Sequence, residues 1–333
     1  MHRSRLILPA LTATALALFA QVPAGGAAPA MEWREVFNED GSITQALTPK
    51  APAQKTTGFK TLAAAEVVEV QKATATNGDP NNSFDLVFVG DGYTASDLET
   101  YAANVKSKWD ELSSIEPFAE YKAYFNVWQV NVISNESGVD HDPTKGLLKD
   151  TALDMGFWCQ GRDPNTERLL CVNETRAKEY AALAPAADQV IALGNTSKYG
   201  GAGGSVATAA GSNAQAGQIA IHELGHSIGG LADEYDYPYL NYTGSEPREI
   251  NVTADPTGAK WAEYLGKPSP DGGVIAPVEG ARYYKTGLYR PTANSIMRTL
   301  GKQFNSIGRD AMVKAFKAKI PSLTTPAAAP PAN

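Results

Sequence analysis

Residues 222–234, which read HELGHSIGGLADE, decide the fold of this chain. They contain the pattern H-E-x-x-H, in which His222 and His226 stand four positions apart. Positions i and i+4 lie on one face of a helix, so both imidazoles can bind the same ion. Glu223 projects beside them, where its carboxylate can act as general base towards a metal-bound water. The motif therefore predicts one catalytic Zn²⁺ and the hydrolysis of a peptide bond.

The sequence around the motif is compatible with a helix. Ser212 and Gln215 have the spacing of a capping box, which predicts the beginning of the helix. Gly229 or Gly230 can end it, because glycine adopts the left-handed conformation at little cost. Such an end matters because Asp233 would otherwise lie roughly 16 Å up the helix axis from His222. A turn after the helix can bring a third ligand back to the ion.

The longer pattern H-E-x-x-H-x-x-G, completed here by Gly229, resembles that of the metzincin metallopeptidases. Met297, in the segment 295–298, resembles the Met-turn that lies beneath the metal in these enzymes. Residues 222–235 and the segment 88–93 are similar to the IgA peptidase family of metallopeptidases, over roughly residues 83–320. The resemblance implies a zinc endopeptidase of the metzincin type.

The resemblance leaves the third zinc ligand open. The common metzincin position is occupied by Ala232, and Asp233 and Glu234 follow it. Asp233 is the first choice, because it is nearest that position and aspartate takes the place in some metzincins. Glu234 is the second choice and His141 the third, since no ligand spacing connects His141 to the motif.

Apolar runs and helical patterns alternate along the chain and predict an α/β, zincin-like (α+β) fold. Its mixed twisted sheet carries the H-E-x-x-H helix, and a C-terminal subdomain carries the Met-turn. The predicted strands are 84–89, 125–133 and 189–193. The predicted helices are 96–113, opened by a capping box at Ser96 and Glu99, 173–183 and 309–320.

We expect four parts in the chain. Residues 1–30 have the basic start, apolar run and small-residue end of a signal peptide cleaved near Ala30, which predicts a secreted or periplasmic protein. Residues 31–80 are an N-terminal extension, a propeptide or a small subdomain. Residues 81–322 form the metzincin-like catalytic domain, and residues 323–333 form a disordered tail rich in proline and alanine.

Composition excludes some other classes. The net charge is −7 and there is no Lys/Arg block, so nucleic-acid binding is not expected. No stretch of the mature chain is long and apolar enough to cross a membrane. The two cysteines, Cys159 and Cys171, are expected to form one disulfide in an oxidising compartment, although two free thiols are the alternative.

Several residues near the motif are candidates for substrate contacts. The glycine-rich segment 199–204 is either an edge strand that pairs with an extended substrate or a flexible loop. Arg298 or a nearby tyrosine is a candidate for stabilising the oxyanion. The tyrosines considered are Tyr235, Tyr237, Tyr283 and Tyr284, each of which can equally be a packed structural aromatic.

The sequence thus predicts a zinc metallopeptidase that acts on a protein or peptide substrate. One alternative is an exported, non-catalytic binding protein on a zincin scaffold, although a purely structural site has no need of Glu223. The other is a zinc amidase that acts on cell-wall peptides.

Overall fold

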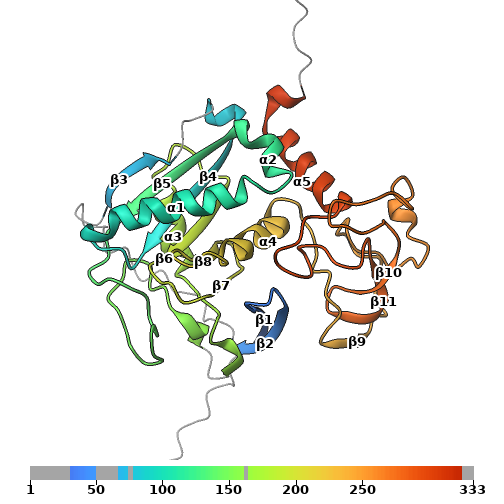
Figure 1. Cartoon of the computed structure of the whole chain (residues 1–333), viewed down its shortest axis with the longest axis horizontal. Coiled ribbons are helices and arrows are strands. Elements are labelled where there is room, and N and C mark those ends of the chain that lie inside the picture. Colours follow the sequence, from blue (N-terminus) through green and yellow to red (C-terminus); the bar gives the residue numbers. More distant parts are fainter. Residues whose placement is uncertain (1–30, 50–66, 74–77, 161–163, 325–333) are drawn as a thin grey trace, which may run out of the picture.

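The computed structural model describes residues 31–49, 67–73, 78–160 and 164–324 (Figure 1). Its largest element is a six-stranded sheet with the order β3-β5-β4-β6-β8-β7. The inner strands are parallel, whereas β3 and β7 at the edges run antiparallel to their neighbours. The bounds are Val67–Lys72 (β3), Phe125–Val132 (β5), Phe84–Asp91 (β4), Gln189–Gly194 (β6), Ala207–Ala210 (β8) and Gly201–Ala202 (β7). This agrees with the predicted mixed sheet and its three predicted strands.

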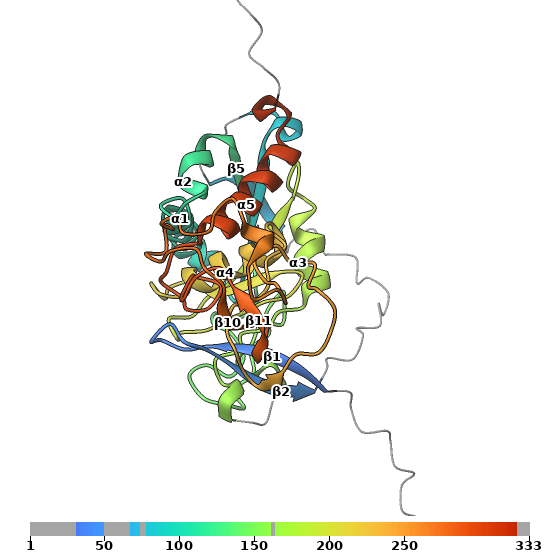
Figure 2. The same ribbon diagram turned by 90° about the vertical axis from the view of Figure 1, so that its right-hand side faces the viewer.

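Helices cover both faces of this sheet. Helices α1 (Leu98–Leu112) and α4 (Gly217–Ser227) contact each other on one face, and α3 (Glu174–Ala181) lies on the other (Figure 2). Strands β4 and β5 are consequently buried at every position, which explains their nearly continuous apolar sequences.

Helix α5 (Ser306–Lys319) closes the core where β4 and β5 begin. The ring of Phe316 packs against Phe84 at 5.6 Å and against Phe125 at 5.3 Å between centroids. The short helix α2 (Phe118–Tyr121) packs on the same ring. The predicted C-terminal amphipathic helix is confirmed and begins three residues earlier, at Ser306.

Two smaller sheets flank α4. One contains β10 (Val278–Ala281), β11 (Tyr284–Arg290) and β9 (Tyr239–Asn241), in that order. The other is an antiparallel hairpin of β1 (Met31–Phe37) and β2 (Ile43–Pro49), which we call the N-terminal hairpin. Within the described residues it pairs with no other strand, and it lies between the two larger sheets (Figure 1).

Both predicted capping boxes were wrong in position. Asp97 accepts hydrogen bonds from the backbone N–H and the hydroxyl of Thr94, so the box begins two residues before Ser96. Helix α4 begins at Gly217 without a side-chain cap, because the Ser212 hydroxyl accepts a hydrogen bond from Asn104 instead. Short 3₁₀ helices complete the elements: Pro80–Asn82, Ala95–Asp97, Lys122–Tyr124, Phe157–Gln160, Pro164–Thr166, Ala259–Trp261 and Pro321–Leu323.

The predicted signal peptide and most of the predicted C-terminal tail are not covered by the structure. The predicted signal peptide, residues 1–30, lies outside the described residues, as do residues 325–333 of the predicted tail. In the part of the chain that is described, no helix has the length and apolar character needed to span a membrane.

Candidate metal centre

Helix α4 places His222 and His226 side by side, with their Nε2 atoms 3.1 Å apart. The Nδ1 atom of His222 lies 2.9 Å from the carbonyl oxygen of Ile296, and that of His226 lies 2.7 Å from the carbonyl oxygen of Leu231. A carbonyl oxygen can only accept, so each Nδ1 carries the proton and donates it. In the neutral imidazoles, Nε2 is thus the atom with the lone pair that metal binding requires.

After α4 the chain turns back through Gly230, whose φ is +59°. The N–H of Gly230 donates to the carbonyl of His226 at 3.0 Å, and the N–H of Leu231 donates to that of Gly225 at 3.2 Å. The bond from Gly230, with the glycine in the left-handed conformation, is the αL ending of a helix. The turn brings Asp233 Oδ1, the first choice of third ligand, to 3.3 Å from Nε2 of both histidines.

Glu234 and His141, the other two candidates for that ligand, do not lie in this cluster. The carboxylate of Glu234 points to the opposite side of the chain, where it accepts hydrogen bonds from Asn251, Ser295 and Asn305. His141 lies in a distant loop and accepts a hydrogen bond from a backbone N–H of that loop. Neither is available to the ion that the histidines would hold.

Glu35, on strand β1 of the N-terminal hairpin, joins the cluster and was missed by sequence reasoning. Its Oε2 lies 3.6 Å from Nε2 of His222, and its Oε1 accepts a hydrogen bond from the Tyr235 hydroxyl. One ligand atom from each of the two histidines, Asp233 and Glu35 lies within 4.8 Å of all the others. No ligand spacing in the sequence connects Glu35 to the motif, so only its placement in the fold identifies it.

The acidic and basic groups of the cluster shift one another's pKa. Burial, and then the charge of Asp233, raises the pKa of Glu35 to about 7. Burial alone would lower the pKa of His226, but the Asp233 carboxylate outweighs it and raises the pKa to about 9. Burial likewise raises the pKa of Glu223. A divalent cation would compensate this concentration of buried negative charge.

Two carboxylate oxygens test whether a metal fits here. Asp233 Oδ1 and Glu223 Oε1 are buried and have no hydrogen-bond partner among the described residues. Buried acceptors without a partner are rare in proteins and often mark an ion. Two imidazole nitrogens and a carboxylate oxygen are donors that zinc binds. The residues present therefore fit the expected Zn²⁺.

The edge of the large sheet lies directly against Glu223. A Cβ atom on Gly203, which follows β7, would lie 2.1 Å from Oε2 of Glu223, so only glycine leaves room for the carboxylate. The segment 199–204 therefore contains the edge strand that was one of its two predicted interpretations. The space beside Gly203 is filled by the carboxylate of Glu223 and is not open to a bound ligand.

Met297 packs against the helix that carries the two histidines. Its Sδ is 2.5 Å from where a Cβ on Gly225 would stand, so the methionine packs against the turn of α4 between the two histidines. Arg298 does not line the cavity at the cluster. It donates to the carbonyl of Glu234 and to Asp236, both at 3.0 Å, which gives it a structural role in place of the predicted oxyanion contact.

The candidate tyrosines differ in what their side chains contact. Tyr283 donates its hydroxyl to Asp233 Oδ2 at 2.6 Å and lines the cavity at the cluster. Tyr235 is fully buried, donates to Glu35 and stacks on Tyr237 at 5.0 Å. Tyr284 packs against the rings of Tyr239 and Tyr242 and against the small apolar cluster that contains Leu288. Only Tyr283 therefore combines contact with a candidate ligand and exposure to the cavity.

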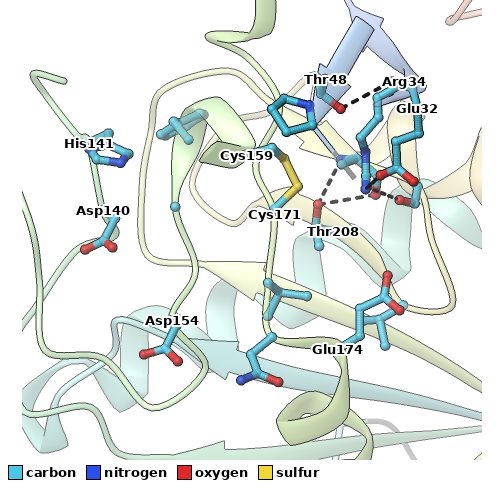
Figure 3. A pocket seen from close by; sticks show the side chains of 18 of the residues that line it. Glu32, Arg34, Thr48, Asp140, His141, Asp154, Cys159, Cys171, Glu174 and Thr208 are labelled. Carbon is cyan, nitrogen blue, oxygen red and sulfur yellow. Dashed lines mark hydrogen bonds and ion pairs between the residues drawn. A yellow bond between two sulfur atoms is a disulfide. The ribbon is translucent and has the colours of Figure 1, made fainter. Parts of the chain in front are cut away.

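Two cavities lie on either side of the N-terminal hairpin, and Glu32, Arg34 and Gly203 line both. The first, of about 530 Å³, adjoins the metal cluster. The second, of about 470 Å³, is shown in Figure 3 and contains His141 in its wall. The predicted disulfide between Cys159 and Cys171 is confirmed and also lines this second cavity.

Comparison with known families agrees with these features. The family model described as IgA Peptidase M64 matches residues 70–271 and 269–316. No curated protein matches the chain. The family match defines the protein as a peptidase of a metallopeptidase class. The chain belongs to the IgA peptidase M64 family. The matched span contains the histidines, Glu223 and Asp233, but it begins after Glu35.

Proposed function

We propose that the protein is a secreted zinc-dependent endopeptidase in which His222, His226 and Asp233 hold one Zn²⁺. The observation that carries the proposal is the buried Oδ1 of Asp233, which lies 3.3 Å from both Nε2 atoms and has no hydrogen-bond partner among the described residues. When bound, zinc would lower the pKa of a water ligand and polarise the carbonyl of a peptide substrate.

Glu223 is the general base and acid of the proposed reaction. Its carboxylate is enclosed between α4 and the backbone at Gly203, and burial raises its pKa above the ordinary range. A carboxylate with a raised pKa takes the proton of the attacking water more readily and then passes it to the leaving amine. Tyr283 keeps Asp233 in position through its hydrogen bond to Oδ2.

The proposed location outside the cytoplasm is supported by the disulfide between Cys159 and Cys171, since such bonds persist in oxidising compartments. The predicted signal peptide ending near Ala30 is the other support. Detection of the protein in the culture medium or the periplasm, with its N-terminus near Met31, would test this part of the proposal.

Replacing Glu223 with glutamine tests the mechanism. We expect zinc to remain bound at one ion per chain and casein cleavage to fall by about 10²–10⁴-fold, because the base is lost and the ligands are kept. Glu249→Gln is the matched control, since Glu249 lines the same cavity but pairs with Arg282 at 3.3 Å. Undiminished cleavage by the Glu223 variant would refute the mechanism.

Assays of cleavage on casein and on cell-wall muropeptides separate the two alternative functions. A zinc-loaded chain that releases amines from cell-wall muropeptides but leaves casein intact would be an amidase. A chain that cleaves neither substrate, even with its metal site accessible, would be a binding protein.

A further inference from the structure

We infer that Glu35 is a fourth ligand of this metal site, and that it keeps the site closed to water and substrate until the N-terminal hairpin moves away. The inference rests on the proposed function, because it assigns a means of regulation to the same site. It concerns a residue that lies outside the span matched by the family.

The Glu35 carboxylate is directed at the site and fixed there. Its Oε2 lies 3.6 Å from Nε2 of His222, and one of its carboxylate oxygens lies within 4.8 Å of a ligand atom of each histidine and of Asp233. Its Oε1 accepts a hydrogen bond from the Tyr235 hydroxyl, and that hydroxyl accepts one from Gln45 on the second strand of the hairpin at 3.0 Å. The hairpin thus supplies both the ligand and part of its support.

The number of ligands determines what the site can do. A catalytic zinc ion has three protein ligands and one open position, whereas a zinc ion with four protein ligands is closed. The two histidines and Asp233 make three ligands, and Glu35 makes four. With Glu35 in place, no position is left for the water that Glu223 would deprotonate.

The hairpin also occupies the edge at which a peptide would bind. Strand β1 contacts the edge strand β7, and Arg34 donates a hydrogen bond to the carbonyl of Gly203 at 2.9 Å. An extended substrate would pair with such an edge through its main chain. Glu32, Arg34 and Gly203 line both cavities, so residues of the hairpin contribute to the wall between the two.

The hairpin joins the peptidase unit through buried side chains rather than through a shared sheet. Among the described strands it pairs with no other sheet, and only an isolated bridge joins Ser42 to Thr299. The family match begins at residue 70, so the shared unit does not include the hairpin. Phe37 and Ile43 are nevertheless buried in the main core, which keeps the hairpin seated until something displaces it.

Cobalt spectroscopy tests the inference on the full chain. Co²⁺ would replace zinc, and acetohydroxamate would probe for an open coordination position through the visible absorption of the metal. We expect the hydroxamate to change the spectrum of Glu35→Gln but not that of the parent or of Glu32→Gln, the matched control on the same strand. We also expect Glu35→Gln to bind zinc at least about tenfold more weakly and to cleave casein faster.

Two results would overturn the inference: a parent spectrum that responds to hydroxamate as strongly as that of Glu35→Gln, or equal zinc affinities for the two proteins. If Glu35→Gln does not fold, Arg34→Ala serves instead, since it loosens the hairpin and leaves every ligand in place. Its Co²⁺ spectrum should respond to hydroxamate although that of the parent does not, and a spectrum as unresponsive as the parent's would also contradict the inference.

The proposed function can fail independently. Hydroxamate can bind to Glu35→Gln although this variant cleaves no peptide. Such a result would support Glu35 as the ligand that closes the site and would refute the proposed peptidase mechanism. The double variant Glu35→Gln/Glu223→Gln should bind hydroxamate and cleave nothing, whereas cleavage by it would refute the role of Glu223 alone. If the intact parent is inactive, Glu35→Gln supplies the background in which Glu223→Gln is scored.

Discussion

Replacing Glu234 with alanine should destabilise the fold without removing a metal ligand. Oε1 of Glu234 accepts hydrogen bonds from Asn251 at 2.9 Å and Asn305 at 2.8 Å, and Oε2 accepts one from Ser295 at 2.7 Å. Asn305 is the N-cap of α5, and Ser295 begins the segment that contains Met297. One fully buried carboxylate therefore joins three segments of the chain around the metal cluster.

The size of the effect follows from these contacts. Alanine would leave two side-chain amides and one hydroxyl without this acceptor, at about 1–3 kcal/mol each. We expect the free energy of unfolding to fall by about 3–5 kcal/mol, and the thermal midpoint by roughly 10 °C. Glu234→Gln should lose only about 1 kcal/mol, because its carbonyl still serves both asparagines and its NH₂ can donate to Ser295.

Thermal and urea unfolding followed by circular dichroism, together with zinc content, would measure these differences. The half-buried ion pair of Glu249 with Arg282 provides the control, since Glu249→Ala should change stability by only about 1 kcal/mol. Zinc should stay at one ion per folded chain in every variant. A Glu234→Ala protein as stable as its parent but without zinc would refute the reasoning and make Glu234 a ligand.

Three other substitutions test particular contacts. Tyr283→Phe removes the hydrogen bond that orients Asp233 and should weaken zinc affinity by about 10–100-fold, as measured by chelator competition. The double replacement of Cys159 and Cys171 by alanine opens a loop with a sequence separation of 12 and should lower the free energy of unfolding by about 3 kcal/mol in urea titrations. Asp91→Asn should lower it by about 2–4 kcal/mol, because the carboxylate accepts two backbone N–H groups and a hydroxyl that one amide cannot all satisfy. A stability equal to the parent's would contradict either of the last two.

The sequence predicted the parts of the fold that depend on local patterns. Strands β4, β5 and β6 have apolar runs because both faces of the sheet are covered, and such runs need no knowledge of distant contacts. Helix α4 was predicted from the spacing of His222 and His226, although its first residue was not. Its beginning was missed because the Ser212 hydroxyl interacts with Asn104, a contact made only in the folded chain.

Asp233, Glu234 and Glu35 show which features of the site could not be predicted from sequence patterns. Asp233 and Glu234 are adjacent carboxylates, and both are buried, so composition does not distinguish them. The backbone path after Gly230 decides which one faces the histidines, and that path depends on packing against the segment around Met297. Glu35 reaches the site only because the hairpin packs through Phe37 and Ile43, contacts that no local periodicity encodes.

The carbonyl groups that orient the two histidines have a consequence for how the chain matures. His222 depends on the carbonyl of Ile296, which is synthesised well after the motif helix. Before that segment docks, the imidazole of His222 has no fixed tautomer, and the affinity of the emerging helix for a metal should be weak. Metal uptake would then be a late event that marks a finished fold. A chain that ends before Ile296 should leave the ribosome with the motif intact and remain without its ion.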